Sequence, residues 1–409
     1  MNSLRRYSHK VRHFGVNAKL YLVYSFANGF SMGILRLLFN FYVLSLGYDA
    51  GTLGLLVALP PIIITFAAIP AGMLGQRIGY RATLMLGAAL MGVSIFGISI
   101  STGVIALVGF SVLRGLSRTF AQVSSAPFMS ENSGREERTH LFSVQAAART
   151  VCSFLGFLLA GVLPTMIAWL LSVGAEDPTA YRGALWVSAA IFGLSVLPLL
   201  RMSRPPAKPA DAARPRLREM LHPPGQLLRL FTPQAILGFG AGMLVPFLNV
   251  YLRTTFDLSD GYVGLLFALQ SLMIAVATLI GPVLAERLSR IRAVLLVQLL
   301  SIPFFIVLGY VPVLWLASAA FLARASLMNA ANPLYNAFAM DAVPEEKRPG
   351  ASAVMQISWQ GTRGLSALVS GQIQQTAGFS ALFPITIGCY LAGSALIWTF
   401  FGKKKGPCD

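Results

Sequence analysis

The chain is poor in charged residues, and the few that it has are mostly basic. Asp, Glu, Lys and Arg make up 11% of its 409 residues, with 15 acidic against 32 basic side chains, whereas hydrophobic residues make up 56%. A soluble domain of this length could not bury so much apolar surface. The scarcity of charge therefore excludes an ordinary soluble domain and indicates a protein of the lipid bilayer.

Residue patterns for catalysis or metal binding are also lacking. The three cysteines show no metal-ligand spacing and are expected to be free thiols, and the four histidines lie in arms, loops or span ends. No apolar run holds a nucleophile with a base or a pair of acids, and no nucleotide-binding loop is present. We expect no cofactor, no metal and no enzyme activity, with an intramembrane enzyme as a remote alternative.

Long apolar runs are what the sequence has in abundance. Each is about twenty residues long, enough for a helix to cross a hydrocarbon core about 30 Å thick, and the alternating pattern of a membrane β-barrel is absent. The sequence predicts an all-α membrane protein with twelve transmembrane helices. The spans are expected to start near Lys19, Thr52, Ala82, Val104, His140, Tyr181, Leu230, Gly261, Ala293, Val311, Gly350 and Phe379.

Basic residues gather on one side of the predicted spans. Alternate loops carry nearly all of the loop Lys and Arg, whereas the opposite loops hold Arg182 and Arg253. By the positive-inside rule, both termini lie in the cytoplasm, and the protein is expected in an inner or plasma membrane. Nucleic acid is excluded as a partner, because the basic residues are scattered over loops rather than clustered with stacking aromatics.

A proline- and arginine-rich stretch at residues 201–229 divides the chain. It is typical of a cytoplasmic linker between an N-terminal six-helix bundle, residues 1–200, and a C-terminal one, residues 230–409. Within it, residues 217–221 either lie as a short amphipathic turn on the anionic membrane surface or are simply solvated.

The two halves repeat one pattern. Residues 54–59, Gly-Leu-Leu-Val-Ala-Leu, return as residues 264–269, Gly-Leu-Leu-Phe-Ala-Leu, at an offset of 210. The same offset relates Arg77 with Arg287, Arg114 with Arg324, Glu131 with Asp341, Arg138 with Arg348, and Gly161 with Gly371. Because each half has an even number of spans, the sequence predicts two pseudo-symmetric six-helix bundles with the same orientation.

A sequence motif follows the second span. Residues 72–81, Gly-Met-Leu-Gly-Gln-Arg-Ile-Gly-Tyr-Arg, resemble the Gly-x-Leu-Ala-Asp-Arg-x-Gly-Arg-Lys signature of the major facilitator superfamily, and residues 284–290 are their counterpart. The resemblance covers essentially the whole chain and implies a monomeric transporter that moves a small-molecule substrate through a central cavity. The acidic residue of the signature is Gln76 here, although Glu286 keeps an acid in the second copy.

The motif loops suggest a gate on the cytoplasmic side. An arginine at such a turn can pair with an acid at a neighbouring helix end, which would latch one state of the alternating-access cycle. The alternative is a static topology anchor, since cytoplasmic loops carry arginines in any case. The candidate gate residues are Gly72, Arg77, Arg81, Glu131, Glu286, Arg287 and Asp341.

Six arginines fall well inside predicted spans, whereas no Asp or Glu does. An arginine at the bilayer centre costs about 2.5–3.5 kcal/mol on insertion scales, so each needs water, an anion or buried polar groups. Arg114 and Arg324 occupy matched positions, which favours a scaffold role over substrate contact. Arg36, Arg118, Arg149 and Arg363 break the two-fold pattern and are candidate substrate contacts, with helix scaffolding as the alternative.

Polar and aromatic residues extend this candidate site. Most such residues form interhelical hydrogen bonds, and a minority contact substrate. The candidates are Asn40, Gln122, Asn249, Gln270, Asn332 and Trp359. Together with the arginines they predict a secondary transporter for an organic anion or an amphiphile with an anionic head, moved by alternating access around a midplane cavity. Multidrug efflux by proton antiport is the alternative, although cation exporters are expected to carry a membrane-embedded carboxylate.

Overall fold

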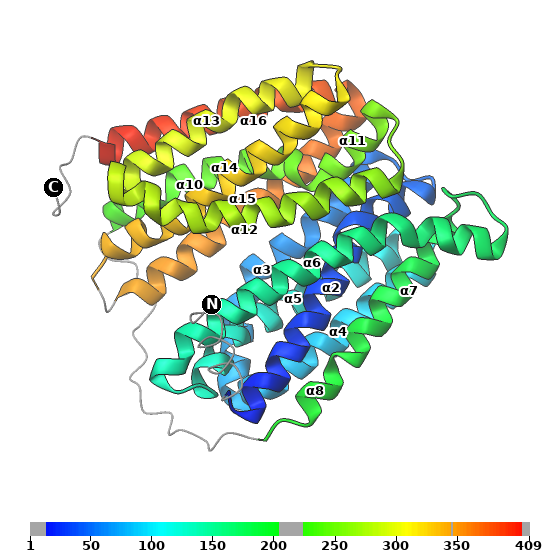
Figure 1. Cartoon of the computed structure of the whole chain (residues 1–409), viewed down its shortest axis with the longest axis horizontal. Helices are drawn as coiled ribbons and strands as arrows, with labels where there is room; N and C mark the ends of the chain where they lie inside the picture. The colour runs from blue at the N-terminus through cyan, green and yellow to red at the C-terminus, as the bar shows by residue number, and fades with distance from the viewer. Residues whose placement is uncertain (1–13, 204–223, 345–346, 403–409) are drawn as a thin grey trace, which may run out of the picture. The chain divides into compact units, whose positions relative to one another are not determined.

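The computed structural model describes residues 14–203, 224–344 and 347–402, and these ranges form helices joined by short loops, without a β-strand (Figure 1). The first half contains α2 (Val16–Ser45), α3 (Ala50–Ile78), α4 (Tyr80–Ile100), α5 (Val104–Glu131), α6 (Arg135–Leu171), α7 (Pro178–Leu194) and α8 (Val196–Leu200). The second half contains α10 (Pro224–Leu244), η1 (Val245–Phe247), α11 (Leu248–Phe256), α12 (Asp260–Leu288), α13 (Arg290–Tyr310), α14 (Leu314–Asp341), α15 (Arg348–Ala377), η3 (Phe379–Ala381), α16 (Leu382–Ile397) and η4 (Trp398–Gly402).

The helices have the length and composition of membrane spans. Eleven stretches of the described residues are long and apolar enough to cross a bilayer, and each starts within a few residues of a predicted span. The remaining long helix, α15, has 30 residues but carries Arg363 and several glutamines, which lower its hydropathy. Counting α15, the all-α architecture with twelve spans is confirmed.

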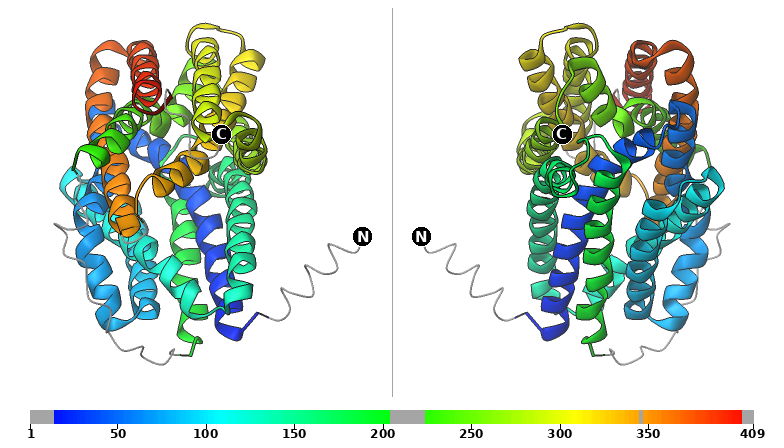
Figure 2. Two further views of the ribbon diagram at one scale, coloured as in Figure 1. Left: turned by 90° about the vertical axis from the view of Figure 1, so that its left-hand side faces the viewer. Right: turned by 90° about the vertical axis from the view of Figure 1, so that its right-hand side faces the viewer.

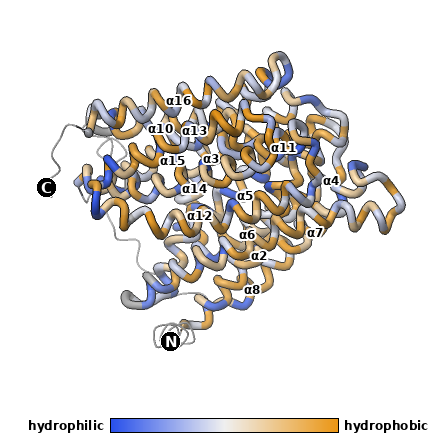
Figure 3. The backbone as a smooth tube through the Cα atoms, turned by 45° about the horizontal axis from the view of Figure 1, so that its top comes forward, coloured by the Kyte–Doolittle hydropathy of each residue, from blue (hydrophilic) through white to orange (hydrophobic). Residues whose placement is uncertain are grey.

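Many large apolar side chains lie on the surface. Phe66, Ile105 and Leu279 are 77%, 89% and 77% exposed. In water such a surface would be costly, whereas lipid tails are an equally apolar solvent. Figure 3 shows the same distribution along the chain, with apolar residues predominating along the helices and hydrophilic residues frequent near their ends.

The helices form two compact units. Each unit contains most of one repeat together with a short segment from the other repeat. The first unit comprises Met1–Tyr48, Phe66–Ala210 and Ser259–Ala268, and the second comprises Asp49–Thr65, Asp211–Leu258 and Leu269–Asp409. In the first unit α2 packs along α6 (Figure 2), and in the second α10 packs along α15. The predicted division at residues 1–200, 201–229 and 230–409 stays a prediction, because most of that linker, including residues 217–221, lies outside the described residues.

Glycine pairs hold the exchanged segments close to their neighbours. In the second unit, a Cβ atom on Gly371 of α15 would lie 2.8 Å from the Cα atom of Gly54 of α3. In the first, a Cβ atom on Gly264 of α12 would lie 2.8 Å from the Cα atom of Gly161 of α6. Real Cβ atoms do not approach other atoms this closely, so these helices pack backbone to backbone. The glycines that repeat at an offset of 210 therefore form two equivalent helix contacts.

Hydrogen bonds repeat in the same way. The Tyr42 hydroxyl donates to Ser99 O at 2.6 Å, and the Tyr251 hydroxyl donates to Leu308 O at 2.8 Å. Near the opposite helix ends, the Arg138 guanidinium donates to Ser130 O and that of Arg348 donates to Met340 O, each at 3.0 Å. Equivalent residues therefore make equivalent contacts, which confirms the pseudo-symmetric duplication.

The motif loop owes its shape to one backbone conformation. Gly79, between α3 and α4, has a φ of 89°, and Ser289, its counterpart between α12 and α13, has a φ of 64°. A positive φ is readily adopted by glycine but is uncommon for other residues. The tight turn of the motif is thus present in both halves, with a less favourable residue in the second.

Candidate functional site

Two arginines of the predicted site, Arg114 and Arg118, share one face of α5 in the first unit. Arg114 is 8% exposed, and its Cζ atom lies 3.9 Å from the centre of the Phe39 ring of α2. Arg118, one turn later, is exposed and lies near enough to Arg114 for the two charges to interact. A guanidinium over an aromatic face is held by a cation–π interaction. The buried arginine is thus packed into the helix bundle, while its neighbour is accessible.

Three further predicted residues lie on the same two helices. On α2, Arg36 is exposed, and Asn40 is 4% exposed. On α5, Gln122 is exposed one turn after Arg118. The structure therefore places an accessible guanidinium on each helix, with an exposed amide beside the one on α5.

A second polar group of the first unit surrounds Tyr21 of α2. Gln145 of α6 donates from Nε2 to the Tyr21 hydroxyl at 3.3 Å, and Arg149, one turn later and exposed, interacts electrostatically with the same tyrosine. Asn28 donates to the Tyr24 hydroxyl at 3.4 Å. The two tyrosines did not enter the sequence prediction, although Tyr21, Tyr24 and Asn28 recur at helical spacing on one face of α2.

In the second unit, two arginines converge on one tyrosine. Arg324 of α14 and Arg363 of α15 both lie within range of electrostatic interaction with Tyr390 of α16. Arg324 is 3% exposed, with its Cζ atom 4.8 Å from the centre of the Phe305 ring of α13, whereas Arg363 is partly exposed. Sequence reasoning missed Tyr390, whose only signal was a tyrosine in the middle of the last span.

The other predicted residues of the second unit are spread over four helices. Asn249 of α11 is 2% exposed, Gln270 of α12 is partly buried, and Asn332 of α14 is exposed. Trp359 of α15 packs against α10, where a Cβ atom on Gly238 would lie 3.2 Å from the indole ring. Two of these helices, α14 and α15, also carry Arg324 and Arg363.

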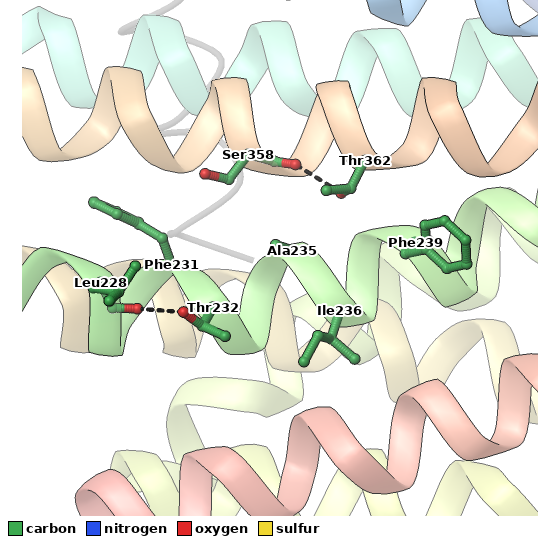
Figure 4. Close-up of a pocket in the computed structure, with 8 residues that line it drawn as sticks. All are labelled: Leu228, Phe231, Thr232, Ala235, Ile236, Phe239, Ser358 and Thr362. Carbon is green, nitrogen blue, oxygen red and sulfur yellow. Dashed lines mark hydrogen bonds between the residues drawn. The ribbon is translucent and has the colours of Figure 1, made fainter.

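A largely apolar groove runs between α10 and α15 (Figure 4). Its volume is about 380 Å³, and it is lined by Leu228, Phe231, Thr232, Ala235, Ile236, Phe239, Ser358 and Thr362. The Thr232 and Thr362 hydroxyls donate to the carbonyls of Leu228 and Ser358, at 2.8 and 2.7 Å. With these hydroxyls engaged by their own helices, the groove offers mainly apolar contact.

The predicted gate residues of the first unit have different surroundings. Arg77 is exposed at the end of α3, and the space beside Gly72 is open. Arg81 donates from Nε to Leu199 O at 2.8 Å and from Nη2 to Leu200 O at 2.7 Å. It therefore caps the last carbonyls of α8, an anchoring role. Glu131 lies close enough to Tyr80 for an electrostatic interaction.

In the second unit, an ion pair joins two helix ends near the counterpart of the motif. Asp341, at the end of α14, pairs with Arg290, at the start of α13. Arg287 and Glu286 are exposed nearby along the chain. Asp341, which was expected to pair with Arg287, thus pairs with Arg290, three residues later in the chain. A latch through Arg287 stays a prediction.

Cysteines, which can bind metal ions, occur in both halves of the described chain. No group of three or more His, Cys, Asp or Glu side chains there could hold a metal ion. Cys152 and Cys389 are free thiols, as expected, and Cys408 lies outside the described residues.

A duplicated bundle of apolar helices with arginines inside its spans is typical of multi-pass membrane transporters. The sequence profile of the Major Facilitator Superfamily matches residues 21–367 and 230–407, and the chain belongs to this superfamily. Its substrate is therefore a small molecule. No curated protein matches the sequence.

Solved transporters share this fold at low sequence identity. The nucleoside transporter NupG is 13% identical, with a TM-score of 0.76 over 96% of this chain and 100% of its own. A bacterial homologue of the human lysosomal transporter Spinster, in an inward-facing and occupied conformation, is 16% identical, with a TM-score of 0.75 over 96% of this chain and 98% of its own. The likeness at this identity concerns the fold alone.

Proposed function

We propose that the protein is a secondary transporter of an organic anion, or of an amphiphile with an anionic head group, that works by alternating access. The observation that carries this proposal is the charge inside the spans: Arg36, Arg118, Arg149, Arg324 and Arg363 lie there, with Arg114. The acids of the spans, in contrast, all lie within three residues of a helix end: Glu131, Asp260, Glu286 and Asp341.

Exposure supports substrate contact for part of this set. Arg36, Arg118 and Arg149 are exposed on their helices, and an exposed guanidinium facing lipid would cost several kcal/mol, about 2.5–3.5 on insertion scales. Such side chains are stable where they meet water or a negatively charged ligand. Guanidinium groups bind carboxylate and phosphate through paired hydrogen bonds, so an anion is the ligand that this chemistry favours.

The groove between α10 and α15 supports an amphiphile over a small inorganic ion. Its walls present Leu228, Phe231, Ile236 and Phe239, and each apolar side chain or methylene buried against such a wall contributes favourably, at about 0.8 kcal/mol per methylene group. An apolar tail would thus have a place on the same helix, α15, that carries Arg363.

The absence of a carboxylate from the span interiors argues against proton-coupled export of cationic drugs. A cationic drug in a low-dielectric site requires an opposite charge, and a coupling proton requires a titratable group. The chain has no Asp, Glu or His in the middle of a span. Uncharged or anionic drugs would remain compatible with the arginines.

The proposal also covers the orientation of the chain in the membrane and its oligomeric state. Arg77, Arg81, Arg138, Arg287 and Arg348 lie at helix ends that alternate with those near the acidic residues Asp49, Asp177 and Asp257. This alternation supports a cell membrane location with both termini in the cytoplasm. A monomeric state is part of the same proposal.

The test is a stability and transport screen of the purified protein. Dicarboxylates, phosphate esters, lysophospholipids and cationic drugs are compared first by thermal shift and then by uptake into proteoliposomes. Anionic compounds should stabilise the wild type, and Arg118→Gln should raise the KM of the transported compound about tenfold or more, since a lost charge-assisted hydrogen bond is worth about 1.5–3 kcal/mol.

The matched control is Arg292→Gln, which removes one exposed basic charge at the start of α13. It should leave the KM unchanged. Stabilisation by cations alone, together with unaltered uptake in Arg118→Gln, would refute an anionic substrate.

A further inference from the structure

The arginine pair of the second unit has an unusual electrostatic environment. Arg324 of α14 lies over the Phe305 ring, whose centre is 5.3 Å from that of the Tyr390 ring of α16. Arg363 of the next helix, α15, interacts electrostatically with the same tyrosine. Within the described residues, neither guanidinium forms an ion pair with a carboxylate, and the buried Nε atom of Arg324 has no hydrogen-bond partner. Charged groups in a low-dielectric interior lose hydration, which is costly unless a partner compensates for it.

The contacts that do hold these arginines compensate only part of this cost. The Phe305 ring lies under the Arg324 guanidinium, with 4.8 Å between Cζ and the ring centre. A cation–π contact leaves the edge of the guanidinium, where its N–H groups point, available to an acceptor. Arginine remains charged in proteins, so deprotonation does not remove the cost of burying it.

An arginine at the position of Arg363 is found only in the second of the two repeats. The residue that matches Arg363 at the offset of 210 is Ser153, whose hydroxyl donates to Gly29 O at 3.3 Å. A pair of arginines on two neighbouring helices is therefore not required by the duplicated framework. A requirement of the ligand is the better explanation.

We propose that Arg324, Arg363 and Tyr390 form a binding subsite for a doubly charged oxyanion, the phosphate monoester group of the transported molecule. This inference rests on the proposed function and narrows its substrate class. Two guanidinium groups supply two positive charges and several N–H donors, and the tyrosine hydroxyl supplies one more donor. A phosphate monoester, with a charge of about −1.5 to −2 at neutral pH and three acceptor oxygens, matches both properties, whereas a monocarboxylate neutralises only one arginine.

Anion binding to the purified full-length protein tests the subsite. Inorganic phosphate, sulfate and acetate are titrated at pH 8 and equal ionic strength, and apparent Kd values are derived from thermal shifts. Phosphate and sulfate should bind at least tenfold more tightly than acetate. Equal affinity for acetate would overturn the assignment to a doubly charged group.

Variants locate the binding within the chain. Arg363→Gln and Arg324→Gln should weaken phosphate binding at least tenfold, and Tyr390→Phe, which keeps the packed ring, should weaken it several-fold. Arg363→Lys provides a charge-preserving variant that loses the paired hydrogen bonds and should fall between wild type and Arg363→Gln. Arg292→Gln is the control and should bind phosphate like the wild type.

The remaining outcomes separate the two proposals. If Arg118→Gln abolishes phosphate binding while Arg363→Gln and Tyr390→Phe bind like the wild type, the subsite is refuted and the anion transporter stands. If no phosphate, sulfate or carboxylate compound binds the wild type, both proposals fail. Should Arg324→Gln not fold, Tyr390→Phe and Arg363→Lys still decide the question.

Discussion

The two units of this transporter share their framework and differ in their charged residues. Tyr42 and Tyr251 make the same hydroxyl-to-carbonyl bond in their respective halves, and the same glycine contact occurs twice. In contrast, the two units differ in the arginines inside their spans. The first unit carries Arg36 on α2, Arg114 and Arg118 on α5 and Arg149 on α6, whereas the second carries Arg324 on α14 and Arg363 on α15. Backbone packing therefore preserves the repeat, while side chains that do not hold helices together are free to diverge.

The helix ends near the motif also differ between the two units. Tyr80 and Glu131 in the first unit occupy the positions of Arg290 and Asp341 in the second, and only the second combination is an ion pair. Arg81, which caps α8 in the first unit, is matched by Ile291, which cannot donate such bonds. The motif-side helix ends of the two units are thus held by different interactions, and each interaction can be removed separately.

The largest effect is expected at the glycine contacts, which the units share. Gly371→Ile and Gly161→Ile would each place side-chain atoms against backbone, since a Cβ atom would lie 2.6 Å from Ala50 O or 2.9 Å from Asp260 O. Overpacking costs about 1–3 kcal/mol, and we expect both variants to lower the Tm and reduce uptake about tenfold or more. Thermal unfolding and proteoliposome uptake measure these effects.

The size-matched controls are Gly109→Ile and Gly388→Ile, where a Cβ atom meets nothing within 4 Å. Both should behave like the wild type. A Gly161→Ile variant as active as its control would show that the two contacts are not equivalent.

The next largest effect is expected at Arg81, which distinguishes the units. Arg81→Met removes two hydrogen bonds to α8, at 2.8 and 2.7 Å, of which one is exposed to solvent, and should lower the free energy of unfolding by about 0.5–1.5 kcal/mol. Arg77→Met, at an exposed position of the same loop, should leave the Tm unchanged and slow turnover more than it weakens binding. Unfolding curves and transport kinetics separate an anchor from a gate, and an unaltered turnover rate in Arg77→Met would count against the latch.

A smaller effect is expected at the ion pair of the second unit. The Arg290 and Asp341 side chains are 49% and 58% exposed, so Arg290→Gln should cost only about 0.2–1 kcal/mol, and less at high salt. A double-mutant cycle with Asp341→Asn measures the coupling, and Tyr80→Phe is the counterpart in the first unit. A coupling energy that does not respond to salt would contradict a solvent-screened pair.

The smallest effect concerns pH at the start of α3. Asp49 accepts hydrogen bonds from the Thr52 amide at 2.8 Å and from Gln375 Nε2 at 2.9 Å, and these bonds hold the pKa of its carboxyl below the usual range. A carboxyl with a lowered pKa contributes stability above its unfolded pKa of about 3.9 and loses it as the pH falls through the folded value. The Tm difference between wild type and Asp49→Ala should be small, constant above about pH 5, and should shrink at lower pH. A difference that grows on acidification would contradict this assignment.

Periodicity and composition were sufficient to predict most of the fold. The starts of the spans, the offset of 210 and the motif turn at Gly79 all follow from local sequence, because an apolar helix in lipid satisfies its own backbone. The exchange of residues 49–65 and 259–268 between the units could not be predicted. This exchange depends on which helices pack against Gly54 and Gly264. A glycine in the sequence indicates that a close contact is possible but not which helix makes it.

The candidate site was predictable only in part. Arginines within apolar runs stand out, since each is costly in a bilayer. Tyr21 and Tyr390 were missed because a tyrosine is compatible with an apolar span, and its role depends on neighbours from other helices. The pairing of Asp341 with Arg290 rather than Arg287 likewise depends on where two helix ends meet.

By itself, the sequence determined that the chain spans a membrane, that its halves are copies, and that its charges inside the spans are basic. These properties are sums over local residues, set by the free energy of transfer from water to lipid. Only the tertiary structure decided which arginine lies over which ring, which of them converge on Tyr390, and which is a helix cap. Such contacts join residues far apart in the chain, and the packing of whole helices decides which of them meet.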